Sequence, residues 1–162
     1  MEVLKYPHPH LFKPCQEVTV FDAALAELLG DMWNIMKAER GVGLAANQVG
    51  LSQRMFVMEG PENEKLFIIN PKILEVSKYN FDFAEGCLSA PGQFLKLFRP
   101  GWVSISYQNE KGEVLKRTFT SLHSVCVQHE MEHLEGKSYL QNKAIPKKAR
   151  IFLAKKWGLK VK

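Results

Sequence analysis

The chain has 162 residues, of which 46% are hydrophobic and 24% are charged, as in an ordinary soluble globular protein. No apolar run is long enough to cross a bilayer, and residues 1–12 lack the layout of a signal peptide. We therefore predict one domain over residues 1–162, located in the cytoplasm and without a membrane partner.

The cysteines also exclude one class of protein. Cys15, Cys87 and Cys126 are too few and too scattered for the disulfide framework of a small secreted domain. Each is therefore a buried thiol, a metal ligand or a nucleophile.

The net charge of +5 is unevenly distributed. Residues 143–162 contain eight Lys or Arg and no Asp or Glu, so the rest of the chain is slightly acidic. Such a basic segment suits a polyanionic partner, or simply forms a solvated helix face.

The first predicted element is a helix that Asp22 caps and that runs to about Arg40, with apolar residues at helical spacing. Gly41 stands where a left-handed C-terminal cap is expected. The following GVGLAANQVG (41–50) is a loop or an extended segment. Strands are predicted at 54–58 and 66–70; Asn70-Pro71 ends the second, and 72–77 is extended again.

The second half of the chain begins with a predicted hairpin of residues 102–108 and 113–120 around a turn at 109–112. A helix follows from about Ser121 to Leu134, and Gly136 ends it. Pro146 can start a basic helix over about 146–160. Short strands without regular alternation with helices predict an α+β fold, with short mixed or antiparallel sheets packed around the helix at 121–134 and a C-terminal helix.

The helix at 121–134 contains the pattern H-E-x-x-H at His129, Glu130 and His133. Histidines four residues apart lie on one helix face, so both imidazoles can reach one cation. Glu130 is placed to bind a water on that cation and accept its proton. Leu122 and Cys126 precede the histidines on the same stripe, which we expect to be buried.

A third metal ligand must come from upstream, because the position that carries a third histidine in some metalloproteases is Tyr139 here, and no Asp or Glu follows Glu135. Cys87, beside Gly86 and before the Pro91-Gly92 pair that we read as a turn, is the best candidate. Weaker candidates are His8, His10 and His123.

The glycine-rich GVGLAANQ (41–48) lacks the third glycine and the Gly-Lys-Ser/Thr ending of nucleotide-binding loops. It is either a helix end with tight packing or a segment along which a substrate backbone lies close to Gly41 and Gly43. Gln48 would then offer an amide donor to a developing oxyanion.

Together these segments resemble the peptide deformylase family, whose motifs are G-x-G-x-A-A-x-Q, E-G-C-x-S and H-E-x-D-H. Here they stand in that order as GVGLAANQ (41–48), EGCLS (85–89) and HEMEH (129–133). The KYP opening, the NP after the second strand and the RP before the hairpin extend the resemblance over nearly the whole chain. It implies an enzyme that removes the formyl group from the N-terminal formylmethionine of nascent polypeptides and releases formate.

The resemblance implies a role for each motif residue. Glu130 would be the general acid and base, with a metal-bound water as nucleophile, and Gln48 and the Leu88 N–H would stabilise the oxyanion. The implied metal ligands are Cys87, His129 and His133. The ligand set suits Zn²⁺, whereas the resemblance implies Fe²⁺ as the physiological ion and allows Zn²⁺, Ni²⁺ or Co²⁺ in purified protein.

The substrate would occupy an apolar pocket for the methionine side chain and bind as a short strand. The residues implied for this site are Val42, Gly43, Phe83, Gly86, Val125 and Cys126. Family members act on chains leaving the ribosome, so the basic C-terminal segment can dock on ribosomal RNA, with Ile151, Phe152 and Trp157 packed on the body of a monomer.

Two residues depart from the family pattern. Glu132 replaces the usual Asp of the third motif, and we expect it to pair with a cation near the site, with Arg99 as the candidate. Ala90 stands where a larger aliphatic residue is frequent and can open the rim of the groove.

Two other functions stay open on the sequence. One is a metallopeptidase that cleaves ordinary peptide bonds with the same H-E-x-x-H chemistry. The other is a non-catalytic nucleic-acid-binding or ribosome-binding module in which the histidines hold a structural metal.

Overall fold

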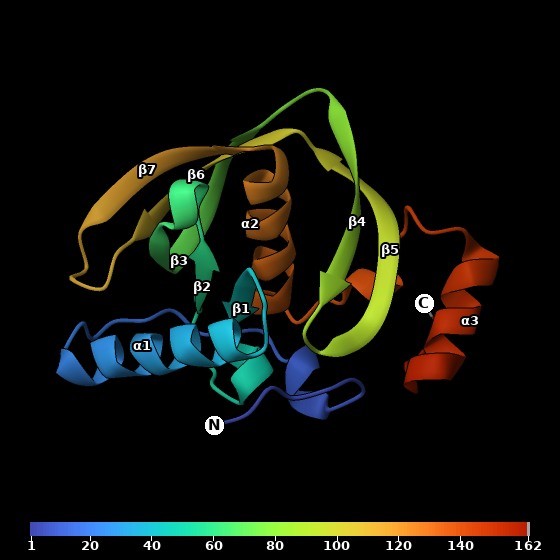
Figure 1. The fold of residues 1–162 in the computed structure, drawn as a ribbon, viewed down its shortest axis with the longest axis horizontal. Coiled ribbons are helices and arrows are strands. Elements are labelled where there is room, and N and C mark those ends of the chain that lie inside the picture. Colours follow the sequence, from blue (N-terminus) through green and yellow to red (C-terminus); the bar gives the residue numbers. More distant parts are fainter. Residues whose placement is uncertain (162) are drawn as a thin grey trace.

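The protein, for which we analyse a computed structural model, is described over residues 1–161 and has an α+β fold (Figure 1). Lys162, the last residue of the predicted domain and of the basic segment, lies outside the described residues. The α-helices are α1 (Ala23–Ala38), α2 (Ser121–Leu134) and α3 (Lys147–Trp157). Short 3-10 helices occupy Pro9–Phe12, Ala46–Val49, Pro61–Asn63 and Tyr139–Gln141.

In the described part of the chain, seven strands form two antiparallel sheets. The strands are β1 (Gly43–Ala45), β2 (Met55–Glu59), β3 (Lys65–Val76), β4 (Asn80–Cys87), β5 (Ala90–Pro100), β6 (Trp102–Gln108) and β7 (Val114–Thr120). One sheet has the order β1-β2-β3-β6-β7, and the other is the β4–β5 hairpin. In Figure 1, α2 stands between the larger sheet and the hairpin, while α3 lies beyond β5.

The apolar residues of these elements pack into three clusters around α2. One joins α1 to β1 and β2, a second joins α2 to β2, β3, β6 and β7, and a third joins the N-terminal segment to β5 and α3. The C-terminal half of α2 is therefore enclosed on several sides, and the side chains of His129, Glu130, Met131 and His133 are buried inside the protein.

Several predicted elements are confirmed. The Asp22 side chain accepts a hydrogen bond from the Leu25 N–H at 2.9 Å and caps α1. The hairpin β6–β7 and the helix α2 have the predicted extents, and a C-terminal helix begins after Pro146. No helix in the described part of the chain is long and apolar enough to cross a membrane.

Other details of the prediction are wrong. Arg40, with φ 59°, has the left-handed conformation after α1 that was expected of Gly41. Asn70 does not end a strand: β3 continues through a register shift at this left-handed residue (φ 51°), because the Asn70 side chain bonds both the N–H and the carbonyl of Val18. The turn after Cys87 is made by Leu88 and Ser89, not by a Pro-Gly pair.

The predictions of a buried apolar face on α2 and of apolar packing by α3 are only partly correct. Leu122, at the start of the histidine stripe of α2, is half exposed rather than buried. On α3, Phe152 is 66% exposed and does not pack on the body, because Leu153 and Ala154 occupy the buried face instead.

Candidate active site

Three potential metal ligands converge where the end of β4 meets α2. The donor atoms of Cys87, His129 and His133 all lie within 4.8 Å of one another. His133 Nε2 is 3.2 Å from both Cys87 Sγ and His129 Nε2. Donors around a tetrahedral ion with bonds of about 2.0 Å to nitrogen and about 2.3 Å to sulfur stand roughly 3.3–3.6 Å apart. The donor set and its spacing therefore fit a divalent cation.

The pKa values of the two histidines are shifted in opposite directions. Burial lowers the pKa of His133 well below its usual value, which favours the neutral imidazole that binds metals. Burial alone would also lower the pKa of His129, but Cys87 and Glu85 outweigh it and hold that pKa well above the usual value.

A buried ion-pair network fixes His129 from behind. Glu85 Oε1 lies 3.0 Å from His129 Nδ1, so the other ring nitrogen of His129 is aimed at Cys87 and His133. Arg99 donates to Glu85 at 2.5 and 2.9 Å and to Glu132 at 2.8 and 3.2 Å. The predicted pairing of Glu132 with Arg99 is therefore confirmed. Glu85 is a further member of the site; it opens the EGCLS motif, but no role was predicted for it.

Glu130 lies beside this group at the wall of the cavity described below, and its side chain is buried. It is 4% exposed, and burial raises the pKa of its carboxyl to about 7. Its Oε2 has no hydrogen-bond partner among the described residues. Such a carboxyl can accept and return a proton near neutral pH.

Gln48 is held next to Cys87 by its own short 3-10 helix. Its Oε1 accepts from the Ala45 N–H at 2.9 Å, while its Nε2 donates to Ser89 Oγ at 3.1 Å and lies 3.5 Å from Cys87 Sγ. The amide donor therefore points at the metal-ligand group rather than into the core. Leu88 follows Cys87 in the turn, and its carbonyl oxygen accepts from Lys5 Nζ at 2.7 Å.

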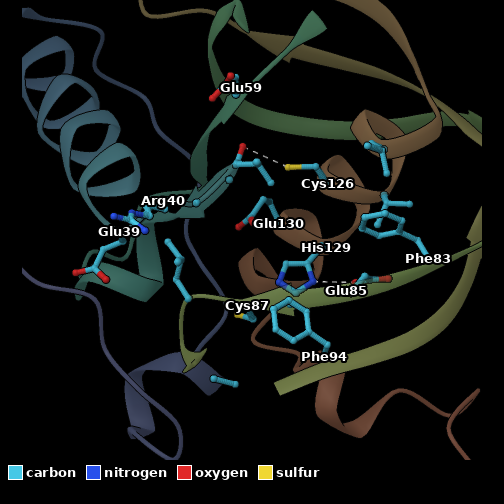
Figure 2. Close-up of a pocket in the computed structure, with 18 of the residues that line it drawn as sticks. Glu39, Arg40, Glu59, Phe83, Glu85, Cys87, Phe94, Cys126, His129 and Glu130 are labelled. Carbon is cyan, nitrogen blue, oxygen red and sulfur yellow. Dashed lines mark hydrogen bonds and ion pairs between the residues drawn. The ribbon is translucent and has the colours of Figure 1, made fainter. Parts of the chain in front are cut away.

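A cavity of about 740 Å³ opens to solvent here, bordered by Gln48, Cys87, Leu88, His129 and Glu130 (Figure 2). The predicted substrate residues all line it: Val42, Gly43, Phe83, Gly86, Val125 and Cys126. Ala90 also lines it but is buried in the third apolar cluster. The cavity lies between two strands that each have an unpaired edge, β1 of the larger sheet and β4 of the hairpin.

Sequence reasoning missed two apolar side chains at the cavity, Leu122 and Phe94. Leu122 was detectable, since it lies four residues before Cys126 on the same helix face. Phe94 belongs to β5, a strand that the sequence analysis did not predict.

The weaker candidates for the third ligand lie outside the ligand group. His10 Nε2 lies 2.9 Å from the Leu51 carbonyl oxygen, and His123 lies at the outer part of the cavity. The two remaining thiols also lie outside the ligand group. Burial raises the pKa of Cys15 to about 11 and that of Cys126 well above its usual value. Both are expected to stay protonated and unliganded.

Known proteins resemble this chain over nearly its full length. The sequence model of the family described as polypeptide deformylase matches residues 1–149. A peptide deformylase of Phenylobacterium zucineum is 39% identical over 145 residues, which are 87% of this chain and 86% of that protein. A peptide deformylase-like protein of Agrobacterium fabrum is 37% identical over 155 residues, covering 96% of this chain and 93% of its own.

Solved structures agree with the sequence relatives. The crystal structure of peptide deformylase from Ehrlichia chaffeensis has a TM-score of 0.90 at 32% identity and covers 98% of this chain and 94% of that one. A peptide deformylase from Synechococcus elongatus, in complex with actinonin, has a TM-score of 0.90 at 31% identity and covers 99% and 87%. The family match, the relatives and the shared fold together establish that this chain belongs to the polypeptide deformylase family.

Proposed function

We infer that this enzyme removes the N-formyl group from the N-terminal formylmethionine of nascent polypeptides and releases formate. The observation that carries the inference is a ligand group of Cys87, His129 and His133 beside a cavity that Cys87, His129 and Glu130 line. Hydrolysis of a formyl amide needs an activated water, a proton carrier and a place for negative charge. The residues around this cavity can supply each of them.

Cys87, His129 and His133 would hold the metal ion. When bound, a divalent cation supplies a Lewis acid that lowers the pKa of water and polarises a carbonyl group. We propose Fe²⁺ as the physiological ion, with Zn²⁺, Ni²⁺ or Co²⁺ able to replace it in purified protein, because the ligand set of one thiolate and two imidazoles accepts all of them.

Glu130 moves the proton. As a carboxylate it takes a proton from the attacking water, and as a carboxylic acid it gives that proton to the leaving nitrogen of the peptide. A pKa raised by burial to about 7 suits both halves of this task near neutral pH. Gly43 leaves the space in which the carboxylate lies, since a Cβ there would come within 2.7 Å of Glu130 Oε1.

The side-chain amide of Gln48 and the backbone N–H of Leu88 would stabilise the oxyanion on the formyl carbon. The contacts of Gln48 with Ala45 and Ser89 fix the amide before substrate arrives, so little reorganisation is needed during the reaction.

The substrate would lie as a short strand between the edges of β1 and β4, bonded to main-chain groups near Val42, Gly43 and Gly86. Its methionine side chain would enter the apolar pocket of Phe83, Val125 and Cys126. A substrate of this kind places the enzyme in the cytoplasm, next to the ribosome, where we propose that it works as a monomer of one domain.

Helix α3 would dock on ribosomal RNA. It has lysines at both ends and no acidic residue, and Phe152 is exposed on it. We predict that reversing the charge of Lys147, Lys148 and Lys155 weakens sedimentation with ribosomes at low salt and leaves deformylation of a short peptide unchanged. Equal sedimentation of the reversed variant and the natural protein would refute the docking.

The reaction itself is tested by comparing formyl-Met-Ala-Ser with unblocked Met-Ala-Ser. We expect formate from the first and no cleavage of the second. Cleavage of the unblocked peptide would favour an ordinary metallopeptidase, and inactivity on both with one metal bound per chain would favour a non-catalytic module.

A further inference from the structure

Two exposed phenylalanines stand on the same face of β5, and only one of them reaches the cavity. Phe94 is 67% exposed and Phe98 is 57% exposed. They are four residues apart on one strand, so their side chains leave the same face of the hairpin. Phe94 lines the cavity, whereas Phe98 lies farther along the hairpin beside Asp82 and is not among the lining residues.

The ring of Phe94 covers the bare backbone of Gly86. A Cβ on Gly86 would come within 2.8 Å of Phe94 Cε1. Glu85, the neighbour of Gly86, points to the opposite face of β4, toward His129. Phe94 therefore extends the cavity wall around the strand edge, from the side that faces α2 to the outer side of the hairpin.

Phe83 belongs to the inner side of the same wall. It shares a face of β4 with Glu85 and stacks on Phe81 with ring centroids 6.3 Å apart. In the view of Figure 2, Phe83 is drawn toward Cys126 and Phe94 toward Cys87. The two rings thus offer apolar surface on opposite sides of the strand edge along which the peptide is proposed to bind.

The backbone next to Phe94 is anchored through its neighbour Gln93. The Gln93 carbonyl oxygen accepts from Tyr139 Oη at 2.6 Å, and its side-chain Oε1 accepts from Lys156 Nζ at 2.8 Å and Trp157 Nε1 at 3.4 Å. This part of β5 is therefore attached to α3, and the exposed ring beside it is prepositioned for contact rather than carried on a loose loop.

We propose that Phe94 forms a second apolar subsite of the enzyme, which selects formylated peptides with a large apolar or aromatic side chain directly after the methionine. This inference rests on the proposed function. Successive side chains of an extended peptide point to opposite faces. When the methionine side chain enters the inner pocket, the next side chain points outward, to the side on which Phe94 stands.

The test is a panel of peptides formyl-Met-Xaa-Ser in which Xaa is Leu, Phe, Ser or Asp, assayed by formate release with the metal-loaded full chain. The natural protein is expected to show a higher kcat/KM for Leu and Phe. Phe94→Ala should lower kcat/KM about 5- to 10-fold for these two peptides and less than twofold for Ser and Asp. A tenfold change equals ~1.4 kcal/mol, as expected for about 50 Å² of apolar area removed from water.

Phe98→Ala is the matched control, because it removes a ring of similar exposure from the same face of the same strand. It should leave the whole panel unchanged, and Phe94→Leu should restore most of the preference. The proposal is overturned if the natural protein shows no preference, if Phe94→Ala keeps the preference, or if Phe98→Ala loses as much. Absence of formate from every peptide would instead contradict the proposed function.

Discussion

Gly43→Ala tests how closely the catalytic carboxylate is packed. The new methyl would stand 2.7 Å from Glu130 Oε1 and 2.8 Å from Cys126 Sγ. Non-bonded atoms pack at roughly 3.5 Å, so Glu130 must move by more than half an ångström. A shift of about 1 Å in a reacting group can cost about 100-fold in rate. We therefore predict a kcat lowered roughly 10- to 100-fold.

The assay is formate release from formyl-Met-Ala-Ser, with bound metal measured on the same sample. Gly30→Ala is the control, since Gly30 is inside α1 and, apart from the adjoining helix itself, no atom of the described residues lies within 4 Å of the new methyl. That change should stabilise the helix by about 0.5–1 kcal/mol and leave turnover intact. Turnover of Gly43→Ala within twofold of the natural protein, at equal metal content, would show that the close packing of Gly43 does not fix the catalytic position of Glu130.

Two further predictions concern the buried charges. Glu85→Ala leaves Arg99 buried with Glu132 alone, so we expect a loss of about 3–5 kcal/mol in unfolding free energy, measured by urea titration. Glu132→Ala should cost less, since that side chain is 30% exposed. An equal loss in the two variants would contradict a larger contribution from Glu85. The pKa of Glu130 is about 7 in the folded protein and 4.5 in the unfolded chain. The ion-free protein should therefore lose stability as the pH rises from 4.5 to 7, because the unfolded chain releases this proton more readily than the folded protein. Ion-free Glu130→Gln should therefore match the natural protein near pH 4.5 and exceed it by roughly 3 kcal/mol at pH 8, and equal thermal melts at pH 8 would be evidence against a raised pKa.

Local sequence patterns predicted α2 and the β6–β7 hairpin, because the residues that begin and end these elements lie close together in the sequence. The helix α2 is followed by a glycine stop, and β6 alternates buried and partly exposed residues before an Asn-to-Gly turn, so α2 and the β6–β7 hairpin were predicted to within one residue of their observed bounds. The hairpin β4–β5 was not predicted, because its turn consists of Leu88 and Ser89, which carry no turn signal. The Pro91-Gly92 pair, a typical turn signal, lies inside β5.

The same limit applies to the site. Motif spacing indicated the histidines of α2, and the departure at Glu132 indicated a partner for Arg99. Glu85 could not be assigned to His129 from the sequence, since only the pairing of β4 with β5 and the packing of both on α2 bring it there. Phe94 was missed for the same reason. Residues that act through a neighbouring strand become visible only once the sheet register is known.

Metal-dependent deformylation with Glu130 as proton carrier is tested most directly by formate release from formyl-Met-Ala-Ser, with protein purified without air and loaded separately with Fe²⁺, Ni²⁺ and Zn²⁺. We expect release with at least one metal. Release should be abolished in Cys87→Ala through loss of the metal, and lowered at least about 1000-fold in Glu130→Ala, which should retain the metal. Full activity of Glu130→Ala, or no release with any metal despite one bound ion per chain, would contradict this mechanism.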